Sequence, residues 1–342
     1  MRAMILSRLA SLAEQPEPLA LVERPDPVPG PGEIVVRVRA CGVCHTELDE
    51  IEGRTPPPRL PVVPGHQAVG TVTACGPGAT RLAPGARVGV GWIYSACGAC
   101  ERCRRGEENL CADFRAAGRD ADGGYAELMS VPEAFAVPIP AGLSDLAAAP
   151  LLCAGAIGYR SLRLTGLGAG GRLGLTGFGA SGHLVLKMVR YTQPATKVYV
   201  FSRNAGEREF ARELGAVWTG AIGERAPEPL DAIIDTTPAW RPVVEALADL
   251  APGGRLVINA IRKEETDKEA LLGLDWAAHL WLEKEIKSVA NVTRADIAAA
   301  LDLAAAASLA PQVEQHPLED ANGALRLLRR GGTRGARVLR IS

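Results

Sequence analysis

A glycine-rich turn, Gly177-Phe178-Gly179-Ala180-Ser181-Gly182, follows an apolar stretch over Arg172–Thr176 and opens a helical pattern. A strand, a G-x-G-x-x-G turn and a helix in this order are typical of a βαβ unit that binds a dinucleotide. Gly177 allows the tight turn, Gly179 lets the backbone approach a pyrophosphate, and Gly182 lets helix and strand pack closely. The helix N-terminus offers free N–H groups to the phosphates. The alternative is a glycine-rich turn that binds no ligand.

Strands and helices alternate from about residue 153 onward, which predicts βαβ units and a parallel sheet. Beyond the first strand, strands are expected at Lys197–Phe201, Leu230–Asp235, Arg255–Asn259, Lys287–Val292 and Ala336–Ile341. Helices are expected at His183–Tyr191, Glu207–Leu214, Ala295–Ala307 and Leu318–Arg330. The first part of the chain instead alternates as β structure between Gly/Pro turns, at Glu33–Ala40, Ala68–Ala74 and Arg87–Val90. A chain of 342 residues with two such patterns suits two domains.

Composition excludes several classes of protein. The net charge is −1, from 38 basic and 39 acidic residues, so charge gives no case for binding nucleic acid or an anionic membrane. Charge-free stretches such as Leu146–Tyr159 are too short for a membrane span, which needs roughly 18–20 apolar residues. The first twelve residues lack the basic start and apolar core of a signal peptide, so a cytoplasmic protein is expected.

Four of the eight cysteines, Cys97, Cys100, Cys103 and Cys111, form the pattern C-x2-C-x2-C-x7-C. Without a secretion signal, a disulfide framework is the poorer interpretation. Four thiolates at this spacing predict a closed tetrahedral zinc site, which stabilises a loop and performs no chemistry. An iron–sulfur cluster and a reduced, metal-free loop are the alternatives.

A second group of ligand-type residues is spread along the chain. Cys44 lies in Cys-His-Thr-Glu, His66 in Pro-Gly-His-Gln, and Cys153 in Leu-Leu-Cys-Ala-Gly. Each alone could be a small buried residue. Together they supply two sulfurs and one nitrogen, the donor set of a catalytic zinc with one position open to substrate.

The end of the second βαβ strand bears on the choice of cofactor. In NAD-binding proteins an acidic residue there, about 20 residues after the glycine turn, usually hydrogen-bonds the ribose of the cofactor. Here the strand ends in Phe201-Ser202-Arg203, where Ser202 and Arg203 could bind a 2′-phosphate. NADP(H) is therefore favoured over NAD(H), with Glu207 close enough in sequence to leave the alternative open.

In combination and order, these motifs resemble the zinc-dependent, medium-chain alcohol dehydrogenases from about Met4 to Ile341. The resemblance implies an α/β fold of two domains. A β-rich catalytic domain resembling GroES would comprise residues 1–152 and 292–342 and carry both zinc sites. A Rossmann domain, a doubly wound parallel sheet, would comprise residues 153–291 and bind the dinucleotide.

The resemblance also implies roles for individual residues. Cys44, His66 and Cys153 would bind the catalytic zinc, and the four-cysteine segment the structural zinc. Thr46 would bind the substrate oxygen and begin a proton relay. His45 and Arg337 would contact the cofactor pyrophosphate, and Trp92 would form a wall of the substrate pocket.

Three residues depart from the pattern of many relatives. Glu47 replaces the Asp that orients the zinc-bound His, and Gln67 replaces a Glu that follows it; such neighbours tune a metal site. The outer histidine of the relay is absent, so the proton would leave through Asp49, the cofactor ribose or water.

The implied activity is hydride transfer between NADP(H) and a primary or aromatic alcohol or aldehyde. Cys153 favours such substrates over polyols, for which relatives tend to have a carboxylate at that position. The alternatives are an NAD-dependent alcohol dehydrogenase and a catalytically silent nucleotide-binding protein on the same scaffold. By analogy, the chain is expected to form a homodimer or homotetramer.

Overall fold

The computed structural model describes residues 1–331 and 335–341, and the contacts within the chain divide it into two compact units. The first unit comprises Met1–Ala156 and the chain from Asn291 onward, and the second comprises Ile157–Ala290. The first division lies four residues after the expected domain boundary at 152/153, and the second lies one residue before the expected boundary at 291/292. Cys153 therefore belongs to the first unit. No helix in the described part of the chain is long and apolar enough to cross a membrane.

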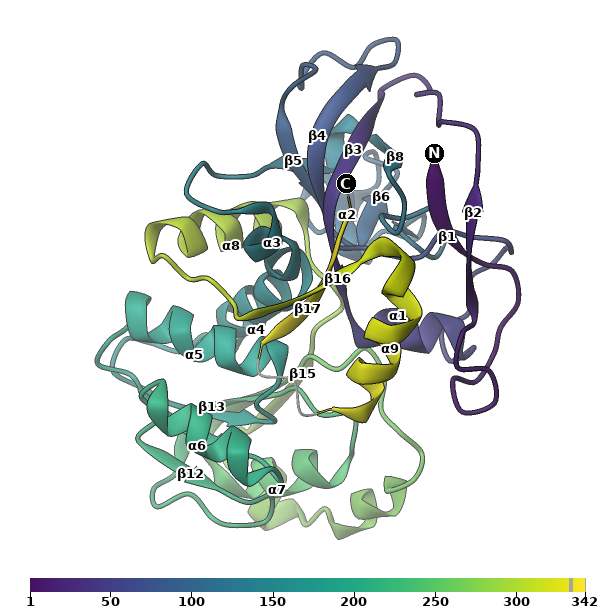
Figure 1. The fold of residues 1–342 in the computed structure, drawn as a ribbon. Coiled ribbons are helices and arrows are strands. Elements are labelled where there is room, and N and C mark those ends of the chain that lie inside the picture. Colours follow the sequence, from purple (N-terminus) through teal and green to yellow (C-terminus); the bar gives the residue numbers. More distant parts are fainter. Residues whose placement is uncertain (332–334, 342) are drawn as a thin grey trace. The chain divides into compact units, whose positions relative to one another are not determined.

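The second unit, drawn in teal to light green in Figure 1, is built on a six-stranded sheet. The strand order is β12-β11-β10-β13-β14-β15. Every neighbouring pair is parallel. The chain runs outward from β10 to β12 and then returns to the other side of β10 at β13, which is the reversal of a doubly wound fold. The strands are β10 Arg172–Thr176, β11 Lys197–Phe201, β12 Trp218–Gly220, β13 Leu230–Asp235, β14 Leu250–Ile258 and β15 Glu285–Ser288. The helices are α4 Ala156–Thr165, α5 Ala180–Thr192, α6 Ala205–Glu213, α7 Arg241–Asp249, η4 Lys268–Gly273 and η5 Trp276–Leu280.

Both faces of this sheet are covered. Successive side chains of β11 point to opposite faces. Val198 and Val200 pack in one apolar cluster with residues of α5 and α6, whereas Tyr199 and Phe201 pack in another with α7. Burial on both faces explains why these strands have continuous apolar sequences rather than alternating ones.

The first unit contains a mostly antiparallel sheet in the order β16-β17-β3-β4-β5-β9, with β8 also paired to β3. Because β17 near the C-terminus pairs with β3, both ends of the chain build this unit. Two short ribbons, β1–β2 and β6–β7, accompany it. The strands are β1 Arg2–Leu6, β2 Leu19–Glu23, β3 Glu33–Val43, β4 Ala68–Cys75, β5 Arg87–Val90, β6 Ile93–Ser95, β7 Arg115–Ala116, β8 Leu128–Pro132, β9 Ala136–Pro138, β16 Val313–Pro317 and β17 Ala336–Arg340. The helices and helical turns are α1 His45–Ile51, α2 Glu101–Arg104, η1 Glu108–Leu110, η2 Glu133–Phe135, α3 Asp145–Pro150, η3 Leu151–Gly155, α8 Arg294–Ala306, η6 Leu318–Asp320 and α9 Ala321–Arg330.

Two predicted strands are wrong in their bounds. The strand expected at Arg255–Asn259 is β14, Leu250–Ile258, which begins five residues earlier. The apolar residues of 287–292 suggest a strand there, but the sheet strand is β15, Glu285–Ser288. Val289 and Val292 are buried, which explains their apolar character. Asn291 has a φ of 58°, a left-handed conformation that ends extended structure.

Candidate functional site

The three dispersed ligand-type residues come together within the first unit. The ligand atoms of Cys44, His66 and Cys153 all lie within 4.8 Å of one another. Cys44 immediately precedes α1, His66 lies just before β4, and Cys153 lies in η3. Three separate segments therefore supply the two sulfurs and one nitrogen that a catalytic zinc prefers.

Glu47 fixes two of these ligands at once. Cys44 is the N-cap of α1, and its backbone N–H donates to Glu47 Oε2 at 2.8 Å. The other carboxylate oxygen, Oε1, is hydrogen-bonded to His66 Nδ1 in a fully buried contact. A glutamate three residues after the N-cap is the residue that reaches back in a capping box. The extra methylene of Glu47 is thus accommodated, because its carboxylate joins the helix cap to the imidazole.

The backbone beside His66 and at Cys153 is unusual. Gly65 has a φ of 101°, and a Cβ there would lie 2.4 Å from the Tyr125 ring, so a side chain would clash. Cys153 lies in a π-helical turn over Leu151–Gly155. Single π turns are frequent at functional sites, where they redirect one side chain.

The protonation of this cluster fits a metal site. The Cys153 thiol donates to Cys44 and lowers the pKa of Cys44 well below its usual value. Burial opposes the charged form of His66, but Glu47 and Cys44 together raise the pKa of His66 well above its usual value. His66 Nε2 is buried without a hydrogen-bond partner among the described residues. With Nδ1 bound to Glu47, this orphaned nitrogen is the atom left to bind a metal, which would displace the protons held by the cluster.

The relay residues and Gln67 lie around this cluster. Thr46 Oγ1 is 3.7 Å from Cys44 Sγ, so the hydroxyl stands beside one ligand. The Asp49 carboxylate accepts a hydrogen bond from Arg54 Nε at 2.5 Å, a partner that the sequence analysis did not foresee. Gln67 packs against β3, where a Cβ at Gly42 would overlap its amide oxygen.

Trp92 adjoins a buried carboxyl group that the sequence analysis missed. Its indole N–H donates to Glu50 Oε1 at 3.3 Å, and its ring centroid lies 5.3 Å from that of Phe114. Burial, reinforced by the charge of Glu47, raises the pKa of Glu50 to about 8. Glu50 follows Thr46 by four residues, so helical spacing could have placed both on one face of α1.

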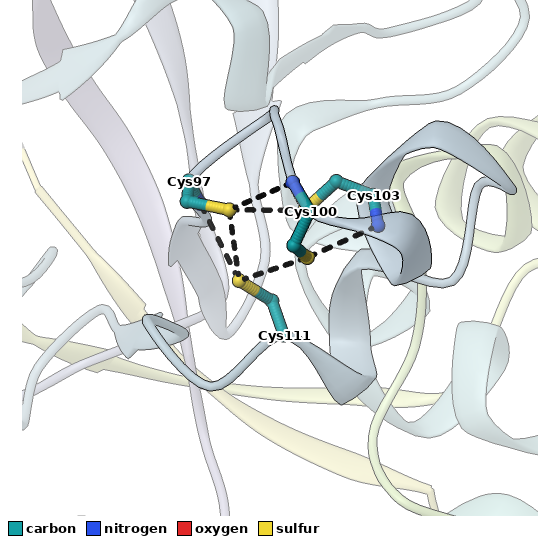
Figure 2. A group of neighbouring side chains, drawn as sticks. All are labelled: Cys97, Cys100, Cys103 and Cys111. Atoms are coloured by element: carbon teal, nitrogen blue, oxygen red, sulfur yellow. Dashed lines mark hydrogen bonds between the residues drawn. The ribbon is translucent and has the colours of Figure 1, made fainter.

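The four-cysteine segment gathers its sulfurs as predicted (Figure 2). The Sγ–Sγ separations are 3.5 Å for Cys97–Cys111 and 3.9 Å for both Cys97–Cys103 and Cys100–Cys111. Four sulfurs at about 2.3 Å from a central zinc would lie about 3.8 Å apart in a tetrahedron. The observed separations therefore match a closed zinc site with four thiolate ligands.

This lobe has little other internal support. Most residues of 96–107 are exposed or half-buried. Backbone N–H groups of Ala99 and Cys100 lower the pKa of Cys97 to about 6, whereas burial and neighbouring thiols raise the pKa of Cys103 to about 12. Without an ion, the cluster does not hold four negative charges, so a bound metal is what would make all four sulfurs thiolates.

In the second unit, the glycine turn has the geometry that its sequence predicts. Gly177 has a φ of 81°, and a Cβ there would lie 2.6 Å from Thr236 Oγ1. A Cβ at Gly182 would lie 2.8 Å from the carbonyl oxygen of Gly177. At Gly179, the N-cap of α5, a Cβ would meet no atom within 4 Å. Two glycines are thus needed for packing, and the third leaves open space at a helix N-terminus, as a phosphate requires.

At the end of β11, a carboxylate reaches the strand from the following helix. Ser202 Oγ donates to Glu207 Oε2 at 2.5 Å and accepts from the Asn204 N–H at 3.1 Å. Arg208 Nη1 donates to the Ser202 carbonyl oxygen at 2.6 Å, and Arg203 is exposed. The Arg208 guanidinium and the Glu207 carboxylate therefore both contact Ser202 at the strand end, where the cofactor ribose is expected, and Arg203 is the next residue.

The two remaining cofactor residues lie close together in the first unit. His45 is the exposed first residue of α1. Arg337 pairs in register with Val43, two residues before His45. The Arg337 guanidinium is ion-paired through Nη1 with Glu314 Oε2 at 2.5 Å, a partner on β16 that the sequence analysis missed.

Comparison with known families agrees with both halves of this description. Residues 30–141 match the family described as "Alcohol dehydrogenase GroES-like domain". Residues 209–339 match the family described as "Zinc-binding dehydrogenase".

Curated relatives match almost the whole chain. "Probable alcohol dehydrogenase AdhA" of Mycobacterium tuberculosis is 44% identical, over 95% of this chain and 93% of its own length. An "Alcohol dehydrogenase" of Geobacillus stearothermophilus is 34% identical, over 97% of this chain and 99% of its own. Among solved structures, a cinnamyl alcohol dehydrogenase of Sorghum bicolor aligns with a TM-score of 0.84 at 28% identity, over 99% of this chain and 97% of its own.

Proposed function

The chain belongs to the zinc-dependent, medium-chain alcohol dehydrogenase family, and on that basis we propose that it interconverts primary or aromatic alcohols and their aldehydes with NADP(H). One observation carries the catalytic part of the proposal. Cys44, His66 and Cys153 converge, and in the part of the chain that the structure describes no group hydrogen-bonds the buried Nε2 of His66. We further propose two zinc ions per chain, one at this site and one in the four-cysteine lobe.

The mechanism assigns a task to each residue around the first site. Cys44, His66 and Cys153 would hold the zinc, and Glu47 would keep His66 turned toward it. The bound zinc and nicotinamide supply Lewis-acid polarisation of the substrate oxygen and hydride chemistry, respectively. During oxidation, Thr46 Oγ1 would accept the substrate hydroxyl proton as its own hydroxyl proton leaves, and both transfers would reverse during reduction. Asp49, the cofactor ribose or water would carry the proton onward.

The substrate class follows from the donor set and the pocket residues. A second thiolate at Cys153 favours simple alcohols and aldehydes over polyols. Trp92, whose ring contacts that of Phe114 at a tilt of 47°, offers an aromatic face for an aromatic substrate. "Probable cinnamyl alcohol dehydrogenase 8A" of rice, 34% identical over 91% of this chain and 88% of its own length, is named for an aromatic alcohol.

NADP(H) is proposed because Ser202 and Arg203 follow β11 in a position to meet a 2′-phosphate, with Arg208 beside them. One observation favours NAD(H) as the second candidate. Glu207 engages the Ser202 hydroxyl, so a carboxylate stands near the strand end, where it would repel a phosphate and accept from a ribose hydroxyl.

Initial rates of benzaldehyde reduction with NADPH and NADH, on one purified batch, decide between these candidates. We expect the larger kcat/KM with NADPH. We also expect Arg203→Ala to reduce it about tenfold or more with NADPH only, since hydrogen bonds to charged groups contribute roughly 1.5–3 kcal/mol.

Glu207→Gln is the matched variant in this experiment. If Glu207 hydrogen-bonds the ribose of NADH, this substitution will lower kcat/KM with NADH. The kcat/KM with NADPH will then be unchanged or higher. A parent enzyme that prefers NADH, together with that result, would overturn the NADP(H) proposal.

A homodimer is proposed through β15, one of the two edge strands of the second unit's sheet, with a tetramer as the alternative. All four residues of β15 are exposed, and Trp276 and Trp281 nearby are 64% and 56% exposed. Exposed apolar patches of this kind mark interfaces. Antiparallel pairing of two β15 strands about Ile286 would also place Glu285 opposite Lys287 of the second copy.

Light scattering after gel filtration tests this interface. Ile286→Arg would place two arginines opposite each other across the two-fold axis, so we expect monomers where the parent forms dimers. Tyr191→Arg, at a similarly exposed apolar position on α5, is the control and should stay dimeric. A dimeric Ile286→Arg protein would contradict the proposed pairing.

A further inference from the structure

A buried ion pair lies in the second unit, outside every residue assigned so far. Lys263 Nζ contacts Asp235 Oδ2, and the two side chains are 9% and 0% exposed. Asp235 Oδ1 also accepts from Thr176 Oγ1 at 2.7 Å and from Thr237 Oγ1 at 2.8 Å. The pair joins the ends of two strands to the loop that follows β14.

The pair occupies the reversal point of the doubly wound sheet. Asp235 ends β13 and Thr176 ends β10, and the two residues are direct partners in the register. Ligands of such sheets bind beyond the carboxyl ends of the strands at this reversal. Gly177, the first glycine of the turn, follows Thr176 directly.

The loop after Asp235 shapes the glycine turn. The Thr236 N–H donates to the carbonyl oxygen of Thr176 at 2.9 Å, and the Thr236 hydroxyl donates to the same oxygen at 3.0 Å. Thr236 Oγ1 occupies the space that a Cβ at Gly177 would need. A shift of the Asp235–Thr237 segment would therefore move the turn itself.

Lys263 is unsuited to bind a phosphate directly. Besides Asp235, its ammonium group donates to the carbonyl oxygens of Thr237 at 2.8 Å and Ala239 at 2.9 Å. An ammonium group has three N–H donors, so these contacts account for all of them. The charge of Lys263 is thus used to neutralise Asp235.

We propose that Lys263 is a positioning residue for the dinucleotide, neutralising Asp235 behind the glycine turn so that an anionic pyrophosphate can bind in front of it. Without Lys263, a buried negative charge would face the incoming phosphates through a low-dielectric interior. This inference rests on the proposed nicotinamide cofactor site. The need for Lys263 to neutralise Asp235 is the same for NADPH and NADH, because both cofactors carry the pyrophosphate.

Calorimetric titration of the full-length protein with NADPH, and separately with NADH, tests the proposal. We expect Lys263→Met to raise the Kd for both cofactors at least about tenfold, equivalent to about 1.4 kcal/mol. The double variant Lys263→Met/Asp235→Asn should bind within about threefold of the parent, because the unpaired charge is gone. A merely structural role for the pair would leave the double variant as impaired as the single one, which would overturn the proposal.

Two further variants separate the possible outcomes. Lys284→Met is the matched control, because Lys284 also donates to two backbone carbonyls of this unit, of Leu247 and Ala278, but just before the amino end of β15. It should bind as the parent does. If Lys263→Met fails to fold, Asp235→Asn tests the proposal in its place, since the asparagine keeps an acceptor for the Thr176 hydroxyl. Unchanged or tighter cofactor binding by Asp235→Asn supports the proposal, and weaker binding overturns it. A parent that binds neither cofactor would instead refute the proposed function.

Discussion

Cys44→Ala is expected to lower kcat for benzaldehyde reduction at least about a thousandfold, because Lewis-acid polarisation supplies several kcal/mol and each 1.36 kcal/mol is tenfold in rate. The zinc content should fall from two ions to one per chain, since His66 and Cys153 alone leave an incomplete site. The remaining ion should be that of the lobe, whose four sulfurs do not include Cys44. Elemental analysis and initial rates on the same sample measure both effects.

Cys75→Ala is the matched control for Cys44→Ala. Cys75 is a free cysteine outside both clusters, and its thiol donates to the carbonyl oxygen of Leu82. The control should keep two zinc ions and nearly the parent rate. Full activity of Cys44→Ala would refute the assigned zinc site. A parent with one zinc per chain, confined to the lobe, would favour a silent nucleotide-binding protein.

Much of the second unit could be predicted because its signals are local. The strands at Arg172–Thr176, Lys197–Phe201 and Leu230–Asp235 match β10, β11 and β13 residue for residue. Each is a short apolar run enclosed by turn residues, so neighbouring sequence is enough to define it. The β15 bounds were wrong because Val289 and Val292 are buried outside the sheet.

The grouping of the ligand-type cysteines and His66 could also be anticipated, since ligand chemistry restricts residue types and spacing. The partners of the surrounding charges could not. Glu207 on Ser202, Arg54 on Asp49 and Glu314 on Arg337 are side-chain pairs whose geometry depends on the fold. A sequence names a charged residue but does not show which neighbour neutralises it.

Cys103→Ser should remove the second zinc and destabilise residues 97–111 more than the rest of the chain. Structural zinc contributes roughly 10–16 kcal/mol in small zinc-binding peptides, and even a quarter of that would hold this exposed lobe closed. Its loss would raise the fraction of open lobe by about a hundredfold or more. Trypsin should then cut rapidly after Arg104 or Arg105, which lie in the lobe and are exposed. Mass spectrometry of timed digests would identify the cuts, with Cys75→Ser as the control.

The same variant discriminates between the possible contents of the lobe. A zinc site predicts a colourless parent with two zinc ions and a Cys103→Ser protein with one, whereas an iron–sulfur cluster would give visible absorption that the variant loses. A metal-free lobe predicts equal metal content and equal cleavage in both proteins. Glu108 links the lobe to the start of α8 through the Arg294 N–H and Nε, both at 3.0 Å. Opening of the lobe should therefore also increase amide exchange at Arg294, an effect outside the lobe that a local change at Cys103 would not produce.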